Sequence, residues 1–422
     1  MRRPLCAFCL SALGVLALCS FLPQMGLLLP SAAIFVVFCL LVWWKGGAAR
    51  GYAVCLLLGA VLGVGIMEMT GARLAKIQDA YAGRDVTLTA EVESTGRAYT
   101  AGRVSAVLMV EKVDGEAVHF RVECASLPKC EAGGRIRGRF SLDVPDATQR
   151  LDDYADGIVL SAEYLSGMLR LGQSESFRAR TARLQAALSR ALRKGMAENT
   201  GGVLAAMVVG DRSHLTSTLR SAYRGAGLSH VLVVSGMHVS ILCGDILSVL
   251  LPYRWEQSYR RRRRRAVSKS LLALVLMGVT GFTPSVRRAA VAVWVSALGV
   301  WVWGPPDALT SLAAAGILMT AVNSYAVWDI GFELSFAAVV GTVAGGVCIR
   351  RARDAWYRRF WKKAKNPVKR PWYFKLPERL WGLAESICIS FCASVATFPV
   401  LVLRGLSVSI YAVASSVAVL WL

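Results

Sequence analysis

Long apolar runs follow one another along much of the chain, and this pattern predicts membrane-spanning helices. A helix that crosses the ~30 Å hydrocarbon core of a bilayer needs roughly 20 mostly apolar residues. The runs after residue 285, and the one near residue 245, carry polar groups, so we expect them to face protein or water rather than lipid. The candidate spans are residues 5–22, 25–44, 52–69, 228–251, 267–282, 289–303, 308–322, 326–349, 381–403 and 406–422.

A different pattern fills the polar segment between the third and fourth runs. Apolar and polar residues alternate there, β-branched residues are frequent, and glycine-containing turns separate the alternating stretches, which predicts β-strands. Five short strands fit a small barrel such as an OB-fold, although another small β domain would fit equally. The predicted strands are residues 85–93, 103–113, 117–124, 135–142 and 157–165.

Residues 177–196 (FRARTARLQAALSRALRKGM) predict a basic amphipathic helix. Leu184, Leu188 and Leu192 recur at helical spacing among many arginines. Such a helix is expected to lie at the membrane surface. Packing on the neighbouring β domain is the alternative.

The predicted elements divide the chain into four parts. Transmembrane helices occupy residues 1–70, an OB-like β domain residues 71–170, the basic amphipathic helix residues 171–200, and a polytopic transmembrane domain residues 201–422. The predicted fold class is a polytopic α-helical membrane protein with an inserted extracytoplasmic small β-barrel domain.

Composition agrees with a membrane protein, and charge predicts its orientation. Apolar residues make up 55% of the 422 residues and charged residues 18%, whereas a soluble domain carries about 25% charged residues. Basic loops are predicted at residues 254–269 and 350–380, and basic loops mark the cytoplasmic side. Placing them inside with Arg2 and Arg3 puts the β domain on the extracytoplasmic side of the membrane. The net charge of +22 also allows an anionic partner.

The eleven cysteines include two in the polar segment, Cys124 and Cys130. An external β domain lies in an oxidising compartment, so these two are a candidate disulfide; two free thiols in a small core are the alternative. No cluster of cysteines and histidines shows the spacing of a complete four-ligand zinc site. No metal site and no cofactor are therefore predicted.

The run 227–242 (GLSHVLVVSGMHVSIL) places His230, Ser235, Gly236 and His238 in an apolar segment. Polar groups inside a membrane helix usually face a bundle interior or a water-filled path. Three interpretations stay open: helix–helix packing, a hydrolytic site in which Ser235 acts with His230 or His238, and the polar lining of a translocation path.

The segment 280–290 (TGFTPSVRRAA) interrupts two hydrophobic runs at Gly281 and Pro284, and Arg287 and Arg288 begin the next run. Broken helices at membrane depth are tolerated where they line a cavity. The arginines either snorkel to headgroups at a hairpin turn or line a path taken by phosphate.

The segment 329–336 (DIGFELSF) carries Asp329 and Glu333 four residues apart, on one face of a helix. Paired carboxylates can do acid–base work or bind Mg²⁺. A structural salt bridge to Arg287 or Arg288 is the more economical hypothesis, because buried charges need partners.

Taken together, GDRS at 210–213 and the three segments above resemble the ComEC-type competence proteins, a family of bacterial DNA-internalisation channels, in their order and spacing. The preceding layout of short spans and an OB-type domain is similar too. The resemblance implies uptake of single-stranded DNA across the inner membrane during natural transformation. By motif matching it implies a functional core of His230, Ser235, Gly236, His238, Arg288 and Asp329.

The resemblance also implies partners. The expected ones are single-stranded DNA, membrane lipids, a DNA receptor protein and a cytoplasmic motor protein. In the OB-like domain, basic residues are the more plausible DNA contacts because aromatic residues are few. The candidates are Arg103, Arg121, Arg135 and Arg137.

Two departures from the family pattern change these expectations. Glu333 stands where glutamine is usual, so we expect it to be paired rather than exposed to DNA. Many members also carry a C-terminal metallo-β-lactamase-like nuclease domain, and its HxHxDH-type motif does not occur here. We therefore expect a channel rather than an enzyme. The alternatives are an intramembrane serine hydrolase using Ser235 and a transporter of another substrate.

Overall fold

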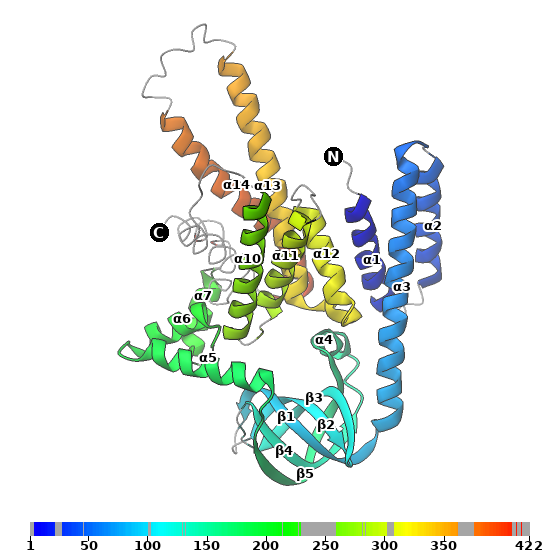
Figure 1. Cartoon of the computed structure of the whole chain (residues 1–422), viewed down its shortest axis with the longest axis vertical. Helices are drawn as coiled ribbons and strands as arrows, with labels where there is room; N and C mark the ends of the chain where they lie inside the picture. Colours follow the sequence, from blue (N-terminus) through cyan, green and yellow to red (C-terminus); the bar gives the residue numbers. More distant parts are fainter. Residues whose placement is uncertain are drawn as a thin grey trace.

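The structure is a computed structural model of the chain. It places a β-barrel at one end of the molecule and a set of helices at the other (Figure 1). The residues that it describes are 4–21, 28–44, 46–99, 103–128, 130, 132–212, 214–226, 228, 259–280, 282, 284–301, 308–361, 375–406, 411 and 415.

Three helices precede the barrel: α1 (Pro4–Phe21), α2 (Leu28–Trp44) and α3 (Ala48–Tyr81). α1 packs along α3, and the Ser11 hydroxyl of α1 donates to the Leu56 carbonyl of α3 at 2.6 Å. The third predicted span ended at residue 69, but the helix continues to Tyr81. The continuation is stabilised by tertiary contacts, because Leu74, Ile77 and Tyr81 pack against the barrel core.

The five predicted strands are confirmed, and all but β2 are longer than predicted. They are β1 (Arg84–Tyr99), β2 (Arg103–Val113), β3 (Glu116–Pro128), β4 (Gly134–Asp143) and β5 (Ile158–Gln173). They close a barrel in the order β1-β2-β3-β5-β4. β3 pairs with β5 in parallel, and the other neighbours are antiparallel.

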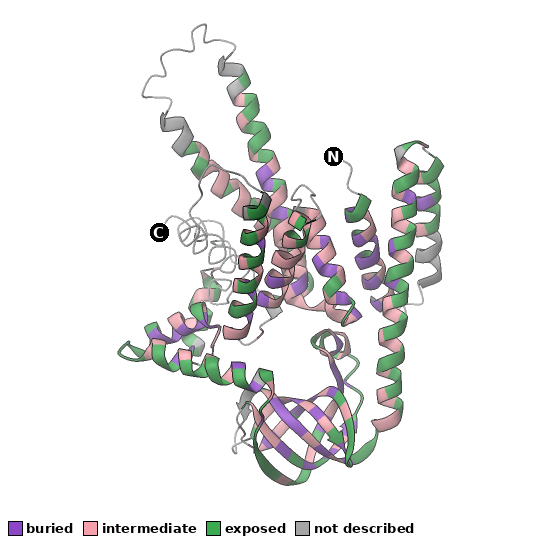
Figure 2. Cartoon of the chain, in the orientation of Figure 1, coloured by how far each residue is buried: buried purple, intermediate pink, exposed green. Residues whose placement is uncertain are grey.

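Apolar and polar residues alternate along each strand, and the apolar ones form the core of the barrel. Inward side chains such as Leu88, Leu108, Val122, Phe140 and Leu160 are fully buried, while their neighbours along each strand face out. Figure 2 shows this alternation as purple segments separated by pink and green ones along the strands of the barrel.

A short helix, α4 (Arg150–Asp156), lies between β4 and β5 on the side of the barrel that faces the helices (Figure 1). It ends at Gly157, whose φ of 79° is left-handed, a conformation that glycine adopts without steric cost. The sequence pattern did not predict this helix.

The basic amphipathic helix is confirmed as α5 (Phe177–Arg193). The helices that follow are α6 (Glu198–Val208), α7 (Ser217–Gly225), α10 (Tyr259–Val279), α11 (Pro284–Trp301), α12 (Ala308–Thr320), the 3₁₀ helix η3 (Ser324–Trp328), α13 (Ile330–Trp361) and α14 (Lys375–Leu403).

The structure corrects the prediction that residues 254–269 and 350–380 are loops. Residues 259–269 lie in α10, residues 350–361 continue α13, and α14 has already begun at Lys375. Arginine and lysine are good helix formers, so both helices extend past their apolar runs. These basic ends point away from the barrel (Figure 1).

Three of the described helices contain segments that are long and apolar enough to cross a membrane: Ala49–Tyr81, Ile330–Trp356 and Leu380–Leu403. They contain the predicted spans at 52–69 and 381–403 and most of the one at 326–349. Shorter apolar helices lie at Pro4–Ser20, Phe35–Trp44 and Leu309–Thr320. The predicted spans at 228–251 and 406–422 lie mainly outside the described residues.

Candidate functional site

The described residues of the TGFTPSVRRAA segment lie at the end of α10 and the start of α11. The Thr280 hydroxyl donates to the Leu276 carbonyl at 2.8 Å at the end of α10. Phe282 has a left-handed φ of 58°, which costs a residue with a Cβ roughly 1–2 kcal/mol. Its ring packs edge-on against Phe177 of α5, with centroids 5.9 Å apart. Pro284 begins α11, a position that suits its fixed φ.

Arg288, in the first turns of α11, connects this segment to the DIGFELSF segment. Its Nη1 lies 3.2 Å from Oδ1 of Asp329, and the two side chains are only 10% and 20% exposed. Its Nε donates to the Ser335 hydroxyl at 3.0 Å. The hypothesis that Asp329 pairs with Arg287 or Arg288 is therefore confirmed, and the partner is Arg288.

Asp329 also shapes the helix that follows it. Its carboxylate accepts the backbone N–H of Phe332, so it caps the N-terminus of α13. A carboxylate is stabilised there by the unpaired N–H groups and the helix dipole. Asp329 thus joins the N-terminus of α13 to Arg288 of α11.

Glu333 has a different partner from the one that the sequence suggested. Its two carboxylate oxygens accept from Nη2 and Nε of Arg404, at 2.9 and 3.1 Å. Such bidentate pairs are among the stronger ion pairs. The hypothesis that Glu333 pairs with Arg287 or Arg288 is corrected, because the end of α14 brings Arg404 over the first turn of α13.

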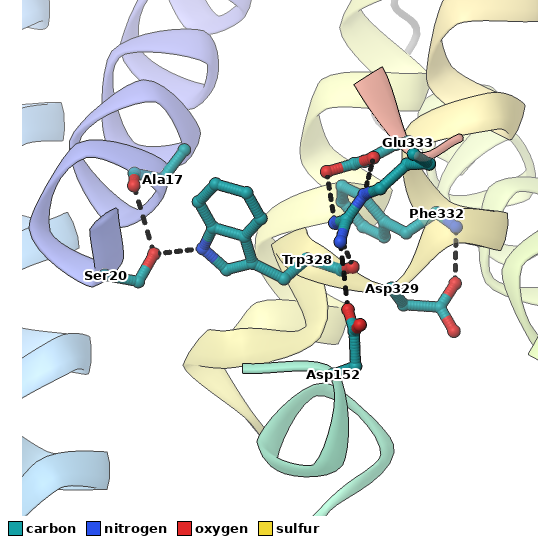
Figure 3. A network of polar contacts seen from close by, with 8 residues as sticks. Ala17, Ser20, Asp152, Trp328, Asp329, Phe332 and Glu333 are labelled. Carbon is teal, nitrogen blue, oxygen red and sulfur yellow. Dashed lines mark hydrogen bonds and ion pairs between the residues drawn. The ribbon is translucent and has the colours of Figure 1, made fainter. Parts of the chain in front are cut away.

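Arg404 is the centre of a larger polar cluster, which we call the Arg404 cluster: Arg404, Glu333, Asp152, Trp328 and Ser20. Arg404 Nη1 lies 2.9 Å from Oδ1 of Asp152 on α4, and Nη2 donates to the Trp328 carbonyl at 2.7 Å. The Trp328 indole N–H donates to the Ser20 hydroxyl at the end of α1. Figure 3 shows these side chains converging from α1, α4 and the η3–α13 segment.

A second set of contacts fixes α4 beside the Arg404 cluster. The Asn323 side-chain amide donates to the Tyr154 and Ala155 carbonyls, at 2.6 and 3.1 Å. The rings of Tyr154 and Tyr325 lie 5.2 Å apart. Gln78 of α3 donates to the Tyr154 hydroxyl at 2.7 Å. The barrel is thereby attached to the helices through α4.

Sequence reasoning missed Arg404, Asp152, Asn323 and Trp328. Arg404 follows directly after a predicted span, so a charge at that boundary was the one available signal. Its partners at 333 and 152 are 71 and 252 positions away, and no local pattern connects them.

Several predicted site residues lie outside the described residues: His230, Ser235, Gly236, His238 and Gly281. Of the GDRS segment, Asp211 accepts a hydrogen bond from the Ser189 hydroxyl of α5 at 2.5 Å. This contact connects the start of the motif region to the basic amphipathic helix.

The four barrel arginines differ in their surroundings. Arg121 pairs with Glu93 at 2.6 Å, and burial lowers the pKa of its guanidinium. Arg135 pairs with Glu111. Arg103 donates to the Ser126 hydroxyl at 3.1 Å, and Arg137 is exposed. Arg103 and Arg137 are consequently better placed than the other two to contact an external anion.

Cys124 and Cys130 are free thiols in the structure, so the predicted disulfide is not formed in it. Cys124 is fully buried in the barrel core, and Cys130 packs against the same core. Burial raises the pKa of both thiols. A disulfide between them stays a prediction for the oxidised protein.

Mg²⁺ binding by Asp329 and Glu333 finds no support, because each carboxylate pairs with an arginine. Within the described part of the chain, no group of three or more His, Cys, Asp or Glu side chains is arranged to hold a metal ion.

Comparison with known proteins identifies the family. A family described as "Competence protein" matches residues 207–422, just over half of the chain. The chain belongs to the competence protein family. The resemblance of its motifs to ComEC-type competence proteins is thus confirmed, and the matched region contains all three polar segments as well as Arg404.

One curated competence protein shows the extent of the similarity. ComE operon protein 3 of Bacillus subtilis (strain 168) is 31% identical over 136 residues, which are 32% of this chain and 17% of that relative. The alignment therefore spans about a sixth of the relative's length. No solved structure matches the chain.

Proposed function

We propose that the chain forms the membrane part of a channel through which single-stranded DNA enters a bacterial cell during natural transformation. The observation that carries this proposal is the family match over residues 207–422. The long apolar helices among the described residues support a location in the inner membrane. We further propose that the chain conducts DNA and does not act as a hydrolase.

The paired charges at the ends of α11, α13 and α14 support a polar interior. An unpaired arginine or aspartate costs up to about 2.5–3.5 kcal/mol at the centre of a membrane helix on insertion scales, and less towards its ends. Arg288 and Asp329, and Glu333 and Arg404, offset this cost by pairing between helices. Charges in such positions are expected to face protein or water rather than lipid.

The distribution of basic residues supports an orientation. The arginine run at the start of α10 and the basic end of α13 lie away from the barrel (Figure 1). Basic segments favour the cytoplasmic side, which leaves the barrel outside the cell. The strand order β1-β2-β3-β5-β4 supports an OB-like barrel, and Arg103 and Arg137 are its proposed DNA contacts.

Transport would need help from other proteins. The membrane potential, negative inside, opposes entry of an anion, so we propose a cytoplasmic motor and an external DNA receptor as partners. His230, Ser235, Gly236 and His238 are the proposed lining of the path.

The test uses a competent host that lacks its own family member. We expect this chain to restore entry of labelled DNA into a nuclease-protected fraction. We expect His238→Ala to lose this entry at normal membrane abundance, because it removes a polar group from the path, and Val233→Ala to keep it.

Two outcomes would contradict the proposal. One is equal entry with the wild-type chain and with an empty vector. The other is labelling of Ser235 by a serine-reactive fluorophosphonate, which would favour the hydrolase.

A further inference from the structure

The basic amphipathic helix α5 lies across the end of a predicted membrane helix. Figure 1 shows α5 running roughly perpendicular to α10, between the barrel and the helices. Its first residue, Phe177, contacts Phe282 in the turn that follows α10, with ring centroids 5.9 Å apart. α5 therefore lies at the ends of the apolar helices that are nearer to the barrel.

One face of α5 is fixed by hydrogen bonds to the protein. At its start, the Ser174 and Ser176 hydroxyls donate to the Glu91 carboxylate of the barrel at 2.8 and 2.9 Å. Further along, Gln185 donates to the Val209 carbonyl at 2.9 Å, and Ser189 donates to Asp211. The helix is therefore held in one rotation about its axis.

The opposite face is exposed and has two parts. With about 100° between successive residues, Phe177, Leu184 and Ala191 form one line, and Phe177 and Leu184 are 68% and 48% exposed. A second line beside it carries exposed basic side chains. These are Arg180, Arg183, Arg190 and Lys194.

The arginines on this face are only weakly neutralised by the protein. Arg180 lies 3.8 Å from Glu175, and both side chains are mostly exposed; such surface pairs contribute little. Arg183 donates to the neutral Gln173 amide at 3.0 Å. The basic line therefore keeps most of its charge for an external anion.

We propose that α5 is an interfacial helix whose exposed face binds the headgroups of anionic phospholipids on the barrel side of the membrane. Helices with an apolar edge and an arginine-rich face lie in the interface plane, and anionic lipids attract basic residues near the surface. Phe177 and Leu184 insert among the acyl chains beside α10, while the arginines bind phosphates. The proposal depends on the membrane location and not on DNA transport.

Photocrosslinking of the full chain in nanodiscs tests the proposal. Benzoylphenylalanine replaces Leu184 in one variant and Ala186 in the other. Ala186 is exposed as well, but it lies on the other side of the helix, about 200° from Leu184. We expect phosphatidylglycerol adducts at position 184 and few at position 186, by mass spectrometry of the peptide.

A second set of variants tests the arginines. Arg180→Gln, Arg183→Gln and Arg190→Gln are each expected to weaken the association of α5 with phosphatidylglycerol about fivefold, the effect of one basic residue near an anionic surface. The matched controls, Arg84→Gln, Lys112→Gln and Arg139→Gln, remove exposed charges of the barrel and should leave the adducts unchanged.

Equal adduct yields at positions 184 and 186 would overturn the proposal, as would equal yields in phosphatidylcholine and phosphatidylglycerol. Displacement of the lipid adducts at 184 by a single-stranded oligonucleotide would assign the arginines to DNA instead. None of these results depends on whether the chain restores DNA uptake.

Discussion

Arg404 connects segments that are far apart in the sequence. Its guanidinium contacts Glu333 on α13, Asp152 on α4 and the Trp328 carbonyl, while its side chain is only 18% exposed. Removing one partner of a largely buried ion pair leaves the other charge uncompensated. The stability of this region therefore depends on both members of the pair.

We predict that Arg404→Gln destabilises the protein by about 2–3 kcal/mol, somewhat less than the loss for a fully buried pair. The double variant Glu333→Gln with Arg404→Gln should lose less, because the largely buried Glu333 carboxylate is then no longer left unpaired, and the Asp152 carboxylate that remains is 52% exposed. Thermal unfolding in detergent, followed by tryptophan fluorescence, measures the difference. Arg351→Gln, an exposed arginine of α13, is the control. A double variant no more stable than Arg404→Gln would contradict the pairing.

The surroundings of Asp153 on α4 disfavour a charged carboxylate. Burial raises its pKa to about 6, and the carboxylates of Glu123, Asp156, Asp152 and Asp146 add to the rise. The folded state binds a proton at Asp153 more tightly than the unfolded state does. Protonation of Asp153 therefore raises the free energy of unfolding at low pH, and this stabilisation is lost as the pH rises from about 4 to above 6.

Asp153→Asn is accordingly expected to raise the melting temperature at neutral pH by no more than about 2 °C, because the half-exposed carboxylate is partly screened by solvent. Near pH 4 the substitution should have little effect. Scanning fluorimetry at both pH values checks this, with Glu116→Gln at the exposed β2–β3 hairpin as control. An equal gain at both pH values would refute it.

At the scale of elements, α13 and α14 pack closely along a small-residue seam. A Cβ added to Gly341 would lie 2.5 Å from the Cys392 carbonyl oxygen, and one added to Gly345 would lie 3.0 Å from the Cα of Ile389. Spacing of small residues by four lets membrane helices approach closely. A larger residue at either position requires the helices to separate.

Gly341→Leu is predicted to cost about 1–3 kcal/mol, the usual cost of overpacking, and to lower the melting temperature in detergent. Gly382→Leu on α14 is a matched control, since a Cβ there meets nothing within 4 Å. If both variants melted alike, the seam would not be a determinant of stability.

The elements that sequence reasoning found are those with local signals. The strands were predicted from alternation and glycine turns, and α5 from leucine spacing. The signal for α4 was too short to recognise, because this helix has only seven residues. The extensions of α3, α10 and α13 were missed because the predicted boundaries followed hydropathy, whereas polar helix formers continue a helix. The partner of Glu333 depended on how α14 folds back onto α13, which no local pattern encodes.

At the scale of the whole molecule, the described residues attach the barrel to the helices in three places. α3 leads directly into β1, α5 leaves β5 and packs beside α10, and α4 is held by Asn323 and Arg404. The α4 attachment consists of side-chain contacts alone, so it is the one that substitution can remove.

We predict that Asn323→Ala combined with Tyr325→Ala weakens this attachment. The amides of residues 150–156 should then exchange hydrogen faster, because α4 is too short to persist without tertiary contacts. Hydrogen–deuterium exchange of the protein in detergent measures this, with Val322→Ala, 81% exposed, as control. Unchanged protection of α4, or equal loss across the barrel strands, would contradict the prediction.

The length of α3 has a consequence for the response of the protein to its lipids. Its 34 residues extend about 50 Å at 1.5 Å per residue, well beyond the ~30 Å hydrocarbon core. Helices adapt to a thinner or thicker bilayer by changing tilt. The last dozen residues of α3 extend roughly 18 Å beyond the hydrocarbon core. A change of about ten degrees in the tilt of α3 therefore moves the end of the helix sideways by roughly 3 Å, and this end is packed against the barrel. The thickness of the bilayer is thus expected to shift the position of the barrel relative to the membrane.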